Sequence, residues 1–530
     1  MHNCPFPRLD ILILGLATSC LFAPAASAQT RPADFDPSPM IKQLADADAA
    51  QGAAVIEKLT VEQVPAFIAS FDPDSLRSDA RDAIMQSIAE KVRKARDAQF
   101  DAFEALDNDW DSRTGLPTYK ANGAHDPAWD KLAADALESS NKISRAAAAK
   151  KFRAAVDAGC TDPLIRYYDV RRSLDMETIT PEAALARYRA ILPDLDKSPY
   201  TPARKFQIRI RILSLCINEL AHDPQTRPIA EEMWNGAVHL LPTLASEMPS
   251  PLLVREAIAI LQKAGTTLGH DRKTDYDKIN PHLATLLPNS TVPYAYAAEF
   301  YTKWAWDARG GGWASSVTEK GWKLFGQRLS LAEEAATNGA NLDPLDGECP
   351  AKMIAICMGK SYDRPTMEKW FNRAMLADPD NYDACHAKYY FLLPEWGGSI
   401  PDVLAFGREC LKTGTVQSRI PVILLDIHSQ LAQDSGQKDA YYAQPEVWKD
   451  IDAVYKKLLF DPSRVTTDHK QWLFDRAKYI KYAYTCHQWQ TVLTLMDQYK
   501  DDVDMQVFGG KTVYNFYKKK ATQQLTKSPV

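Results

Sequence analysis

Two Asp-Pro dipeptides restrict the fold of this chain more than any other feature. Proline cannot continue a helix, and residues of similar type stand at the same distances before both prolines. The two prolines, Pro344 and Pro379, lie 35 residues apart. A small residue precedes each by five positions, Gly339 in the first case and Ala374 in the second. This spacing predicts a repeating pair of helices. The positions eight and twelve residues before the prolines hold Ala336 and Ala332 in the first copy, and Phe371 and Met367 in the second.

The composition also favours helices over strands. The 530 residues include 71 alanines and only 23 glycines, and alanine has the highest helix propensity. Apolar residues recur every three or four positions along most of the chain. Phe206, Ile208, Ile210 and Ile212 alternate as a strand would, but the steps from Phe206 to Ile210 and Leu213 are those of a helix. Because helical patterns flank this segment, we predict an all-α fold.

The repeat resembles the tetratricopeptide repeat (TPR), in which small residues let two helices approach and aromatic residues fill the gaps. After Pro288, the pattern Tyr294-x2-Ala297-Ala298-x2-Tyr301 has similar spacing. The match covers about a third of the chain and is interrupted by an insert at 309–321. The resemblance implies a superhelical array of antiparallel helix pairs with a concave binding surface. The alternative is a set of plain amphipathic helices that happen to end at Asp-Pro.

Breaks in these patterns divide the chain into segments. Turn-rich sequence between residues 107 and 128 predicts a linker, and five lysines without an acid after residue 510 predict a basic tail. The tail is expected to be a solvated helix end or a contact for acidic surfaces. The expected segments are a signal peptide (1–28), a Pro-rich segment (29–39), an N-terminal helical region (40–106), the linker (107–128), a second helical region (129–289), the TPR-like region (290–505) and the basic tail (506–530).

The first 28 residues predict export to the periplasm or secretion. An apolar run begins at Ile11, and Ala26-Ser27-Ala28 is typical of a cleavage site, so the mature chain is expected to begin at Gln29. A competing interpretation is a lipoprotein anchored at Cys20, because Leu16-Ala17-Thr18-Ser19-Cys20 loosely resembles a lipidation motif. After cleavage, no transmembrane segment is expected.

The sequence excludes several classes of function. A net charge of −5 argues against nucleic acid as a partner. Nucleotide-binding, hydrolase and zinc-protease motifs are absent, and no two of the ten histidines stand three or four residues apart. We therefore expect no metal, no cofactor and no catalytic residue that a motif can identify.

Aromatic residues concentrate around the insert. Trp306, Asp307, Arg309 and Trp313 flank the triple glycine 310–312. Two indoles beside a guanidinium and a carboxylate can grip a peptide or a sugar, or they can hold their own loop in place. Loops carry function more often than cores do, so these four residues are a candidate binding site. The neighbouring stripe formed by Trp322, Phe325, Leu329, Ala332 and Ala336 has helical spacing and is predicted to be core.

Two motifs resemble an uncharacterised bacterial family of TPR-like secreted proteins. They are Trp306-x-x-Arg309-Gly-Gly-Gly-Trp313 and Trp396-Gly397-Gly398-Ser399. The resemblance implies no activity. Trp396 is either the lid of a tight turn between two helices or a further residue of the binding site.

Two cysteines stand at equal distances from that turn. Cys385 precedes Trp396 by eleven residues, and Cys410 follows Ser399 by eleven. Antiparallel helices would bring the two side chains together, either as a disulfide or as two buried thiols.

The leading functional hypothesis is a secreted or periplasmic scaffold that binds a protein or peptide through a concave helical surface. The alternative is an all-α enzyme or binding protein for cell-envelope glycan. A glycosidase needs two carboxylates across a cleft, and Glu299, Asp307 and Glu319 lie near the aromatic cluster. A third hypothesis is a purely structural spacer in the cell envelope.

Overall fold

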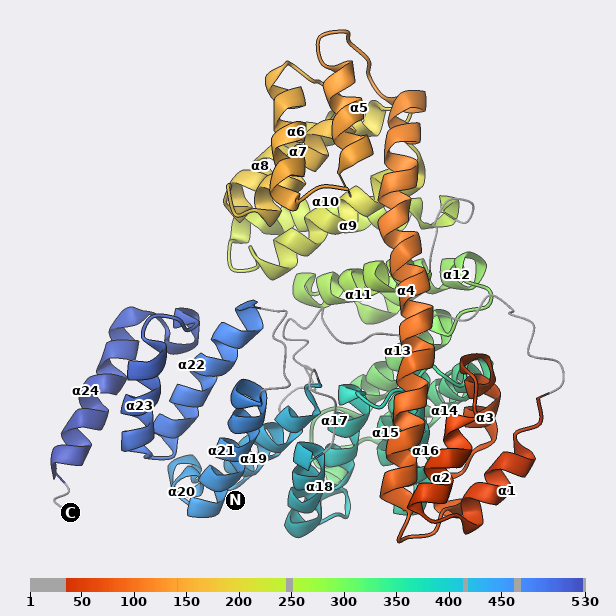
Figure 1. Cartoon of the computed structure of the whole chain (residues 1–530), viewed down its shortest axis with the longest axis vertical. Coiled ribbons are helices and arrows are strands. Elements are labelled where there is room, and N and C mark those ends of the chain that lie inside the picture. Colours follow the sequence, from red (N-terminus) through yellow and green to blue (C-terminus); the bar gives the residue numbers. More distant parts are fainter. Residues whose placement is uncertain (1–34, 141, 245–250, 413–417, 462–468, 528–530) are drawn as a thin grey trace. The chain divides into compact units, whose positions relative to one another are not determined.

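A computed structural model describes residues 35–140, 142–244, 251–412, 418–461 and 469–527. Within these ranges every regular element is a helix and there is no strand, so the predicted all-α class is confirmed (Figure 1). The predicted signal peptide, its cleavage site and Cys20 lie outside the described residues. No helix in the described ranges combines the length and the apolar character needed to cross a bilayer.

The chain forms two compact units, which meet in sequence at Cys349 and Pro350. The helices of the first unit are α1 (Ser38–Asp46), α2 (Ala49–Glu57), α3 (Val64–Ser70), α4 (Arg81–Asn122), α5 (Asp130–Ser139), α6 (Arg145–Asp157), α7 (Pro163–Asp175), α8 (Pro181–Lys197), α9 (Pro202–Asn218), α10 (Arg227–Leu240), α11 (Pro251–Leu268), α12 (Arg272–Leu286), α13 (Val292–Arg309) and α14 (Glu319–Leu342).

The second unit continues with the same kind of element. Helix α15 starts just before the boundary, and the remaining helices follow it in sequence. They are α15 (Glu348–Gly359), α16 (Arg364–Ala377), α17 (Tyr382–Phe391), α18 (Ile400–Lys412), α19 (Ile423–Asp434), α20 (Lys438–Tyr442), α21 (Pro445–Phe460), α22 (His469–Thr485), α23 (Trp489–Tyr499) and α24 (Lys511–Lys527).

Many helices begin with a polar capping residue followed by proline. Asp162 accepts hydrogen bonds from the backbone N–H groups of Leu164 and Ile165, and Pro163 is the first residue of α7. Thr180 and Thr201 cap α8 and α9 in the same way. Such caps satisfy N–H groups that lack a partner within the helix, while proline fixes the backbone angle that the first turn requires.

Helix α9 confirms the helical interpretation of the alternating isoleucines. Phe206, Ile210 and Leu213 are buried on the predicted seam, and Ile208 and Ile212 are buried as well. Both sets are covered because α9 packs against α8, α10 and α11. An apparent strand pattern therefore arises from a helix that is surrounded on several sides.

The predicted linker at 107–128 is wrong, because α4 continues to Asn122 and includes Pro117. Its last turns are held by tertiary contacts: Leu116 packs against the core and Tyr119 is fully buried. The Tyr119 hydroxyl also donates to Asp130 Oδ1 at 2.6 Å. Burial of these side chains offsets the local preference of Gly115 and Pro117 for a turn, and the chain leaves the helix only at Gly123.

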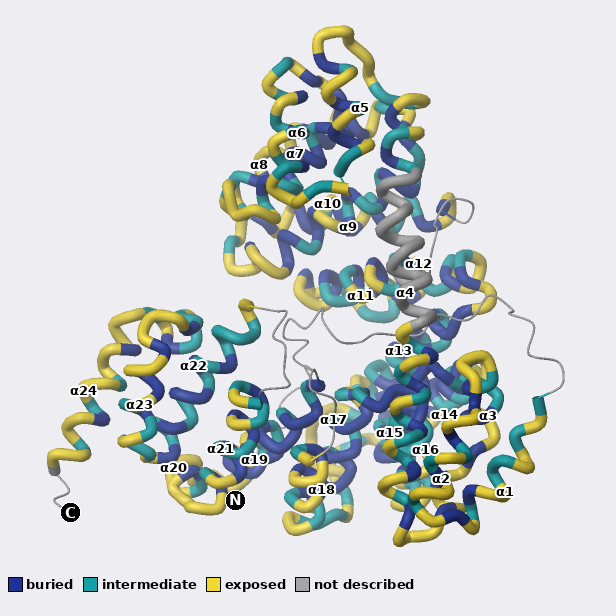
Figure 2. Tube along the Cα trace, in the orientation of Figure 1, coloured by how far each residue is buried: buried dark blue, intermediate teal, exposed yellow. Residues whose placement is uncertain are grey.

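The main core of the first unit lies among α5 to α13 (Figure 2). Trp234, at 1% exposed, is its largest fully buried side chain, and the indole N–H donates to the carbonyl oxygen of Leu261 at 3.1 Å. This bond satisfies the one polar group of the ring.

The Asp-Pro dipeptides mark helix ends, as predicted. Helix α14 ends at Leu342 and α16 at Ala377, immediately before the two aspartates. A side chain at Gly339 would come within 2.4 Å of Cys349 Sγ and 2.8 Å of the Tyr294 side chain. Glycine at position 339 therefore allows a close approach of neighbouring segments.

In the second unit each helix from α16 onward packs on the next. Contacts join α17 to α18 and α19, α18 to α19 and α21, and α21 to α22. Residues 511–527 of the predicted basic tail form α24, in keeping with the expected helix end, and this helix packs on α23 and buries Tyr514. Lys511 and Lys518 of this helix form ion pairs with Asp501 and Asp497 at 2.6 Å, so part of the basic charge is offset.

Candidate functional site

Residues 310–318, here called the tryptophan loop, connect α13 to α14. Gly310 ends α13 with φ at +76°, a backbone conformation that glycine adopts without strain. Thr318 caps the start of α14 by accepting a hydrogen bond from the Gly321 N–H at 3.0 Å. The triple glycine therefore lies at the end of a helix and begins a loop.

Arg309 braces the tryptophan loop from inside. Its Nη1 donates to the carbonyl oxygens of Gly310 and Gly312, each at 3.1 Å. The guanidinium carbon lies 5.4 Å from the ring centroid of Trp306 and 5.5 Å from that of Trp322. Cation–π contacts of this kind contribute about 0.5–1 kcal/mol each where the groups are exposed. Arg309 thus links both helices to the backbone of the loop.

The tryptophans divide between core and surface. Trp306 packs edge-on against Phe325, with ring centroids 4.9 Å apart. Trp313, by contrast, is 64% exposed. Trp322 is 42% exposed, so its predicted place in the core is wrong, although the rest of that stripe is buried. Trp322 lies at the first turn of α14, where its ring contacts Arg309 and the edge of Phe325.

The carboxylates near the loop are engaged by cations. Asp307 Oδ2 lies 3.2 Å from Arg272 Nε, a contact that joins the end of α13 to the start of α12. Glu299 Oε1 lies 2.6 Å from Lys303 Nζ. Of the three acids considered for glycan hydrolysis, two are therefore held in ion pairs.

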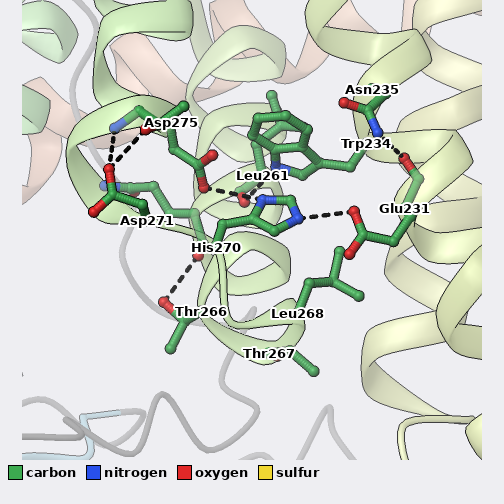
Figure 3. Close-up of polar contacts among 12 residues, drawn as sticks. Glu231, Trp234, Asn235, Leu261, Thr266, Thr267, Leu268, His270, Asp271 and Asp275 are labelled. Atoms are coloured by element: carbon green, nitrogen blue, oxygen red, sulfur yellow. Dashed lines mark hydrogen bonds and ion pairs between the residues drawn. The ribbon is translucent and has the colours of Figure 1, made fainter.

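A histidine bridge lies two residues before Arg272. His270 Nε2 is 2.8 Å from Glu231 Oε2, and His270 Nδ1 is 3.2 Å from Asp275 Oδ2 (Figure 3). The edge of the imidazole faces Trp234, with ring centroids 4.6 Å apart. Each ring nitrogen thus contacts one carboxylate, so the imidazole joins the two acidic side chains. Burial raises the pKa of Asp275, and His270 opposes this effect.

Sequence reasoning considered only pairs of histidines at helical spacing and missed this bridge. The imidazole connects α10, through Glu231, to α12, through Asp275. Gly265 makes room for the contact, because a side chain there would come within 2.3 Å of Asp275 Oδ2. The weak signal in the sequence was a histidine five residues before an aspartate at the start of a helix.

A pair of buried aspartates follows α14. Asp346 Oδ2 lies 3.1 Å from Arg255 Nη2 and also accepts a hydrogen bond from the Thr291 hydroxyl. Asp343 Oδ1 accepts the Leu345 N–H at 2.9 Å, but its buried Oδ2 has no hydrogen-bond partner among the described residues. Burial, together with the negative charge of Asp346, raises the pKa of Asp343 to about 7.

Trp396 belongs to the second unit and is partly buried in the cluster formed around α17 to α19. The 3-10 helix η6 (Pro394–Trp396) leads into Gly397, where φ is +89°. A side chain at Gly398 would come within 2.0 Å of the Leu392 carbonyl oxygen. The WGGS motif therefore forms the tight turn between helices that we predicted, while a role of Trp396 in binding stays a prediction.

The same cluster contains the two cysteines that flank this turn. Cys385 and Cys410 are both buried thiols, and the neighbouring Cys410 together with burial raises the pKa of Cys385 well above its ordinary value. Cys385 Sγ also lies 3.8 Å from Met375 Sδ.

A polar network that sequence reasoning missed crosses the helices of the second unit. The Tyr382 hydroxyl of α17 donates to Asp426 of α19 at 2.5 Å, and burial raises the pKa of Asp426 to about 6. Arg419 donates to both oxygens of Asp475 of α22, at 2.6 and 3.1 Å. The partners stand 44 and 56 residues apart, so no local motif indicates them.

In the described ranges, no three His, Cys, Asp or Glu side chains are arranged to hold a metal ion. No protein-family model matches the sequence, and no curated protein matches it.

Proposed function

We propose that this protein is an exported scaffold of TPR-like helix pairs that binds a protein or peptide through the tryptophan loop. One observation carries the proposal: Trp313 is 64% exposed on a loop that Arg309 braces at both glycine carbonyls. Most of the surface of this large apolar side chain stays in contact with solvent in its own chain. Its surface becomes useful when a partner covers it.

The chemistry of the loop suits a protein partner. Tryptophan and arginine are the residue types most enriched among residues that dominate binding energy. A braced loop also loses little conformational entropy on binding, so more of the contact energy remains as affinity. Trp322, which is 42% exposed, adds a second exposed ring that contacts Arg309.

The second unit supports the scaffold part of the proposal. Its helices pack in sequence, and polar contacts link α17 to α19 and the segment before α19 to α22. In stacked helix pairs, the first helices of successive pairs line the inner surface. Tyr382 and Asp426, which are only partly buried, would lie on that surface if α17 and α19 are such helices.

The test is capture of partners from a periplasmic extract with three immobilised forms of the full chain. The forms are the wild type, Trp313→Ala and the control Leu331→Ala. Leu331 is 42% exposed on α14 and lies nine residues from Trp322, which places it on the opposite face of the helix. We expect the same polypeptides in the wild-type and Leu331→Ala eluates and their loss with Trp313→Ala.

A melting experiment must accompany the capture. Because Trp313 is exposed, its replacement is expected to change the free energy of unfolding by no more than about 0.5 kcal/mol. A loss of about 3 kcal/mol or more would show that Trp313 has a core role. Capture at wild-type strength by Trp313→Ala would also refute the proposal.

The glycan alternative is tested on the same variants. Exposed indole rings also stack on sugars, so the three forms are sedimented with insoluble cell-wall glycan. The glycan alternative is favoured over the proposal if pelleting depends on Trp313 and the eluates contain no polypeptide. Binding of polypeptides in the absence of pelleting supports the proposal.

A further inference from the structure

The buried thiols of Cys385 and Cys410 lie together between two consecutive helices of the second unit. Cys385 is on α17 and Cys410 is on α18, and both belong to one buried apolar cluster. Each residue is at most 3% exposed. Helices α17 and α18 pack on each other, which places the two thiols in one buried cluster.

The turn between the helices holds the thiols in register. Gly397 and Gly398 occupy positions that other residues would enter only with strain or collision. Cys385 stands eleven positions before Trp396 and Cys410 eleven after Ser399, on two helices that pack on each other. Equal spacing from a fixed turn is the arrangement that brings residues of two antiparallel helices together.

We propose that Cys385 and Cys410 are joined by a disulfide that forms while the second unit folds. The reaction is thiol–disulfide exchange with a disulfide-bearing oxidant of the thiol oxidase class. One cysteine attacks the oxidant disulfide as a thiolate and forms a mixed disulfide, and the second cysteine displaces the oxidant. One S–S bond breaks and one forms, the two cysteines lose their protons, and the oxidant leaves as a dithiol.

The reaction takes place during folding, because the thiols are poor nucleophiles once the second unit has folded. The hydrogen bond from Cys410 and burial raise the pKa of Cys385 well above its ordinary value, and exchange needs the thiolate. Burial also keeps oxidants away from the folded pair. For the same reason the disulfide, once formed, is protected from reductants.

The bond would close a loop of 24 intervening residues and limit the freedom of the unfolded chain. For a unit of 150–250 residues, a crosslink of this loop size raises the melting temperature by roughly 6–12 °C. The second unit falls within this size range.

The experiment refolds the full chain from denaturant, once in a mixture of reduced and oxidised glutathione and once with dithiothreitol. Free thiols are then alkylated under denaturing conditions, and the protein is digested without reduction. Mass spectrometry is expected to find the peptides of Cys385 and Cys410 linked, with two hydrogen atoms fewer than the separate peptides. A matched control is Cys216→Ser, which removes another buried cysteine and should leave the link intact.

Melting curves provide the second measurement. The wild type is expected to melt higher after oxidative refolding than after reduction, whereas the Cys385→Ala, Cys410→Ala double variant should melt at one temperature in both conditions. Complete alkylation of both cysteines after oxidative refolding overturns the proposal, and so does a link to any other cysteine. In the cell the reaction also depends on the proposed export, but refolding in glutathione does not, so the two proposals fail separately.

Discussion

Asp343 offers the sharpest quantitative test of the structure. Its Oδ2 is buried without a hydrogen-bond partner among the described residues, and its Oδ1 accepts only the Leu345 N–H. The substitution Asp343→Asn keeps a carbonyl oxygen for that N–H and removes the charge. Because the carboxylate form is the one that burial disfavours, the neutral amide is expected to relieve the folded state of an electrostatic cost.

The magnitude follows from the pKa of Asp343, which burial raises from 3.8 to about 7. Between these values the folded state keeps the proton that the unfolded chain has lost. The contribution of Asp343 to the free energy of unfolding is therefore fully present below pH 3.8 and is lost as the pH rises through 7. At about 1.4 kcal/mol per pKa unit, the wild type should lose on the order of 3 kcal/mol between pH 5 and pH 8.

The assay is urea unfolding of the full chain at several values of pH between 5 and 8, followed by hydrogen exchange of peptides from α14. These peptides assign the transition to the first unit. Asp343→Asn is expected to remove most of the decline with pH and to be more stable than the wild type at pH 8.

Asp346 provides the matched control three residues away. It is paired with Arg255 at 3.1 Å, so Asp346→Asn leaves a buried guanidinium without its closest carboxylate and should cost about 3–5 kcal/mol. The same substitution at two neighbouring aspartates is thus expected to change stability at pH 8 in opposite directions. The reasoning is refuted if Asp343→Asn keeps the wild-type decline, or if both substitutions destabilise the protein to the same extent at pH 8.

Two further substitutions test ion pairs in the separate units. His270→Ala should lower the free energy of unfolding by about 2–3 kcal/mol, because it removes contacts to Glu231 and Asp275 that are partly shielded from water. Urea unfolding that shows no loss would contradict the bridge. Arg419→Ala leaves Asp475 buried without its bidentate partner and should cost about 3–5 kcal/mol by calorimetry. Replacing both partners with apolar residues should cost less, and a larger loss in that double variant would contradict the argument.

The sequence alone is sufficient to predict helix starts and ends that depend on neighbouring residues. Polar caps before proline start α7, α8 and α9, and the Asp-Pro dipeptides end α14 and α16. These signals work because capping and proline geometry act within a few residues. The loop with Trp313 was also predictable, because three consecutive glycines disfavour the continuation of a helix.

The sequence failed where contacts between distant segments outweigh local preference. Pro117 lies inside α4 because Leu116 and Tyr119 are buried there, and Trp322 is exposed although its spacing is that of a core residue. Periodicity indicates which residues share a face of a helix. It does not indicate whether another element covers that face.

The chemistry of the candidate sites was decided by tertiary structure alone. The partners of His270 stand 39 and 5 residues away, and those of Asp346 stand 91 and 55 residues away. Helix propensity, capping and apolar spacing are properties of neighbouring residues, so the sequence by itself determined an all-α chain with an aromatic loop. Burial and charge pairing depend on which segments meet in space, and for that reason only the folded structure decided which tryptophan is exposed, which aspartate binds a proton and which thiols touch.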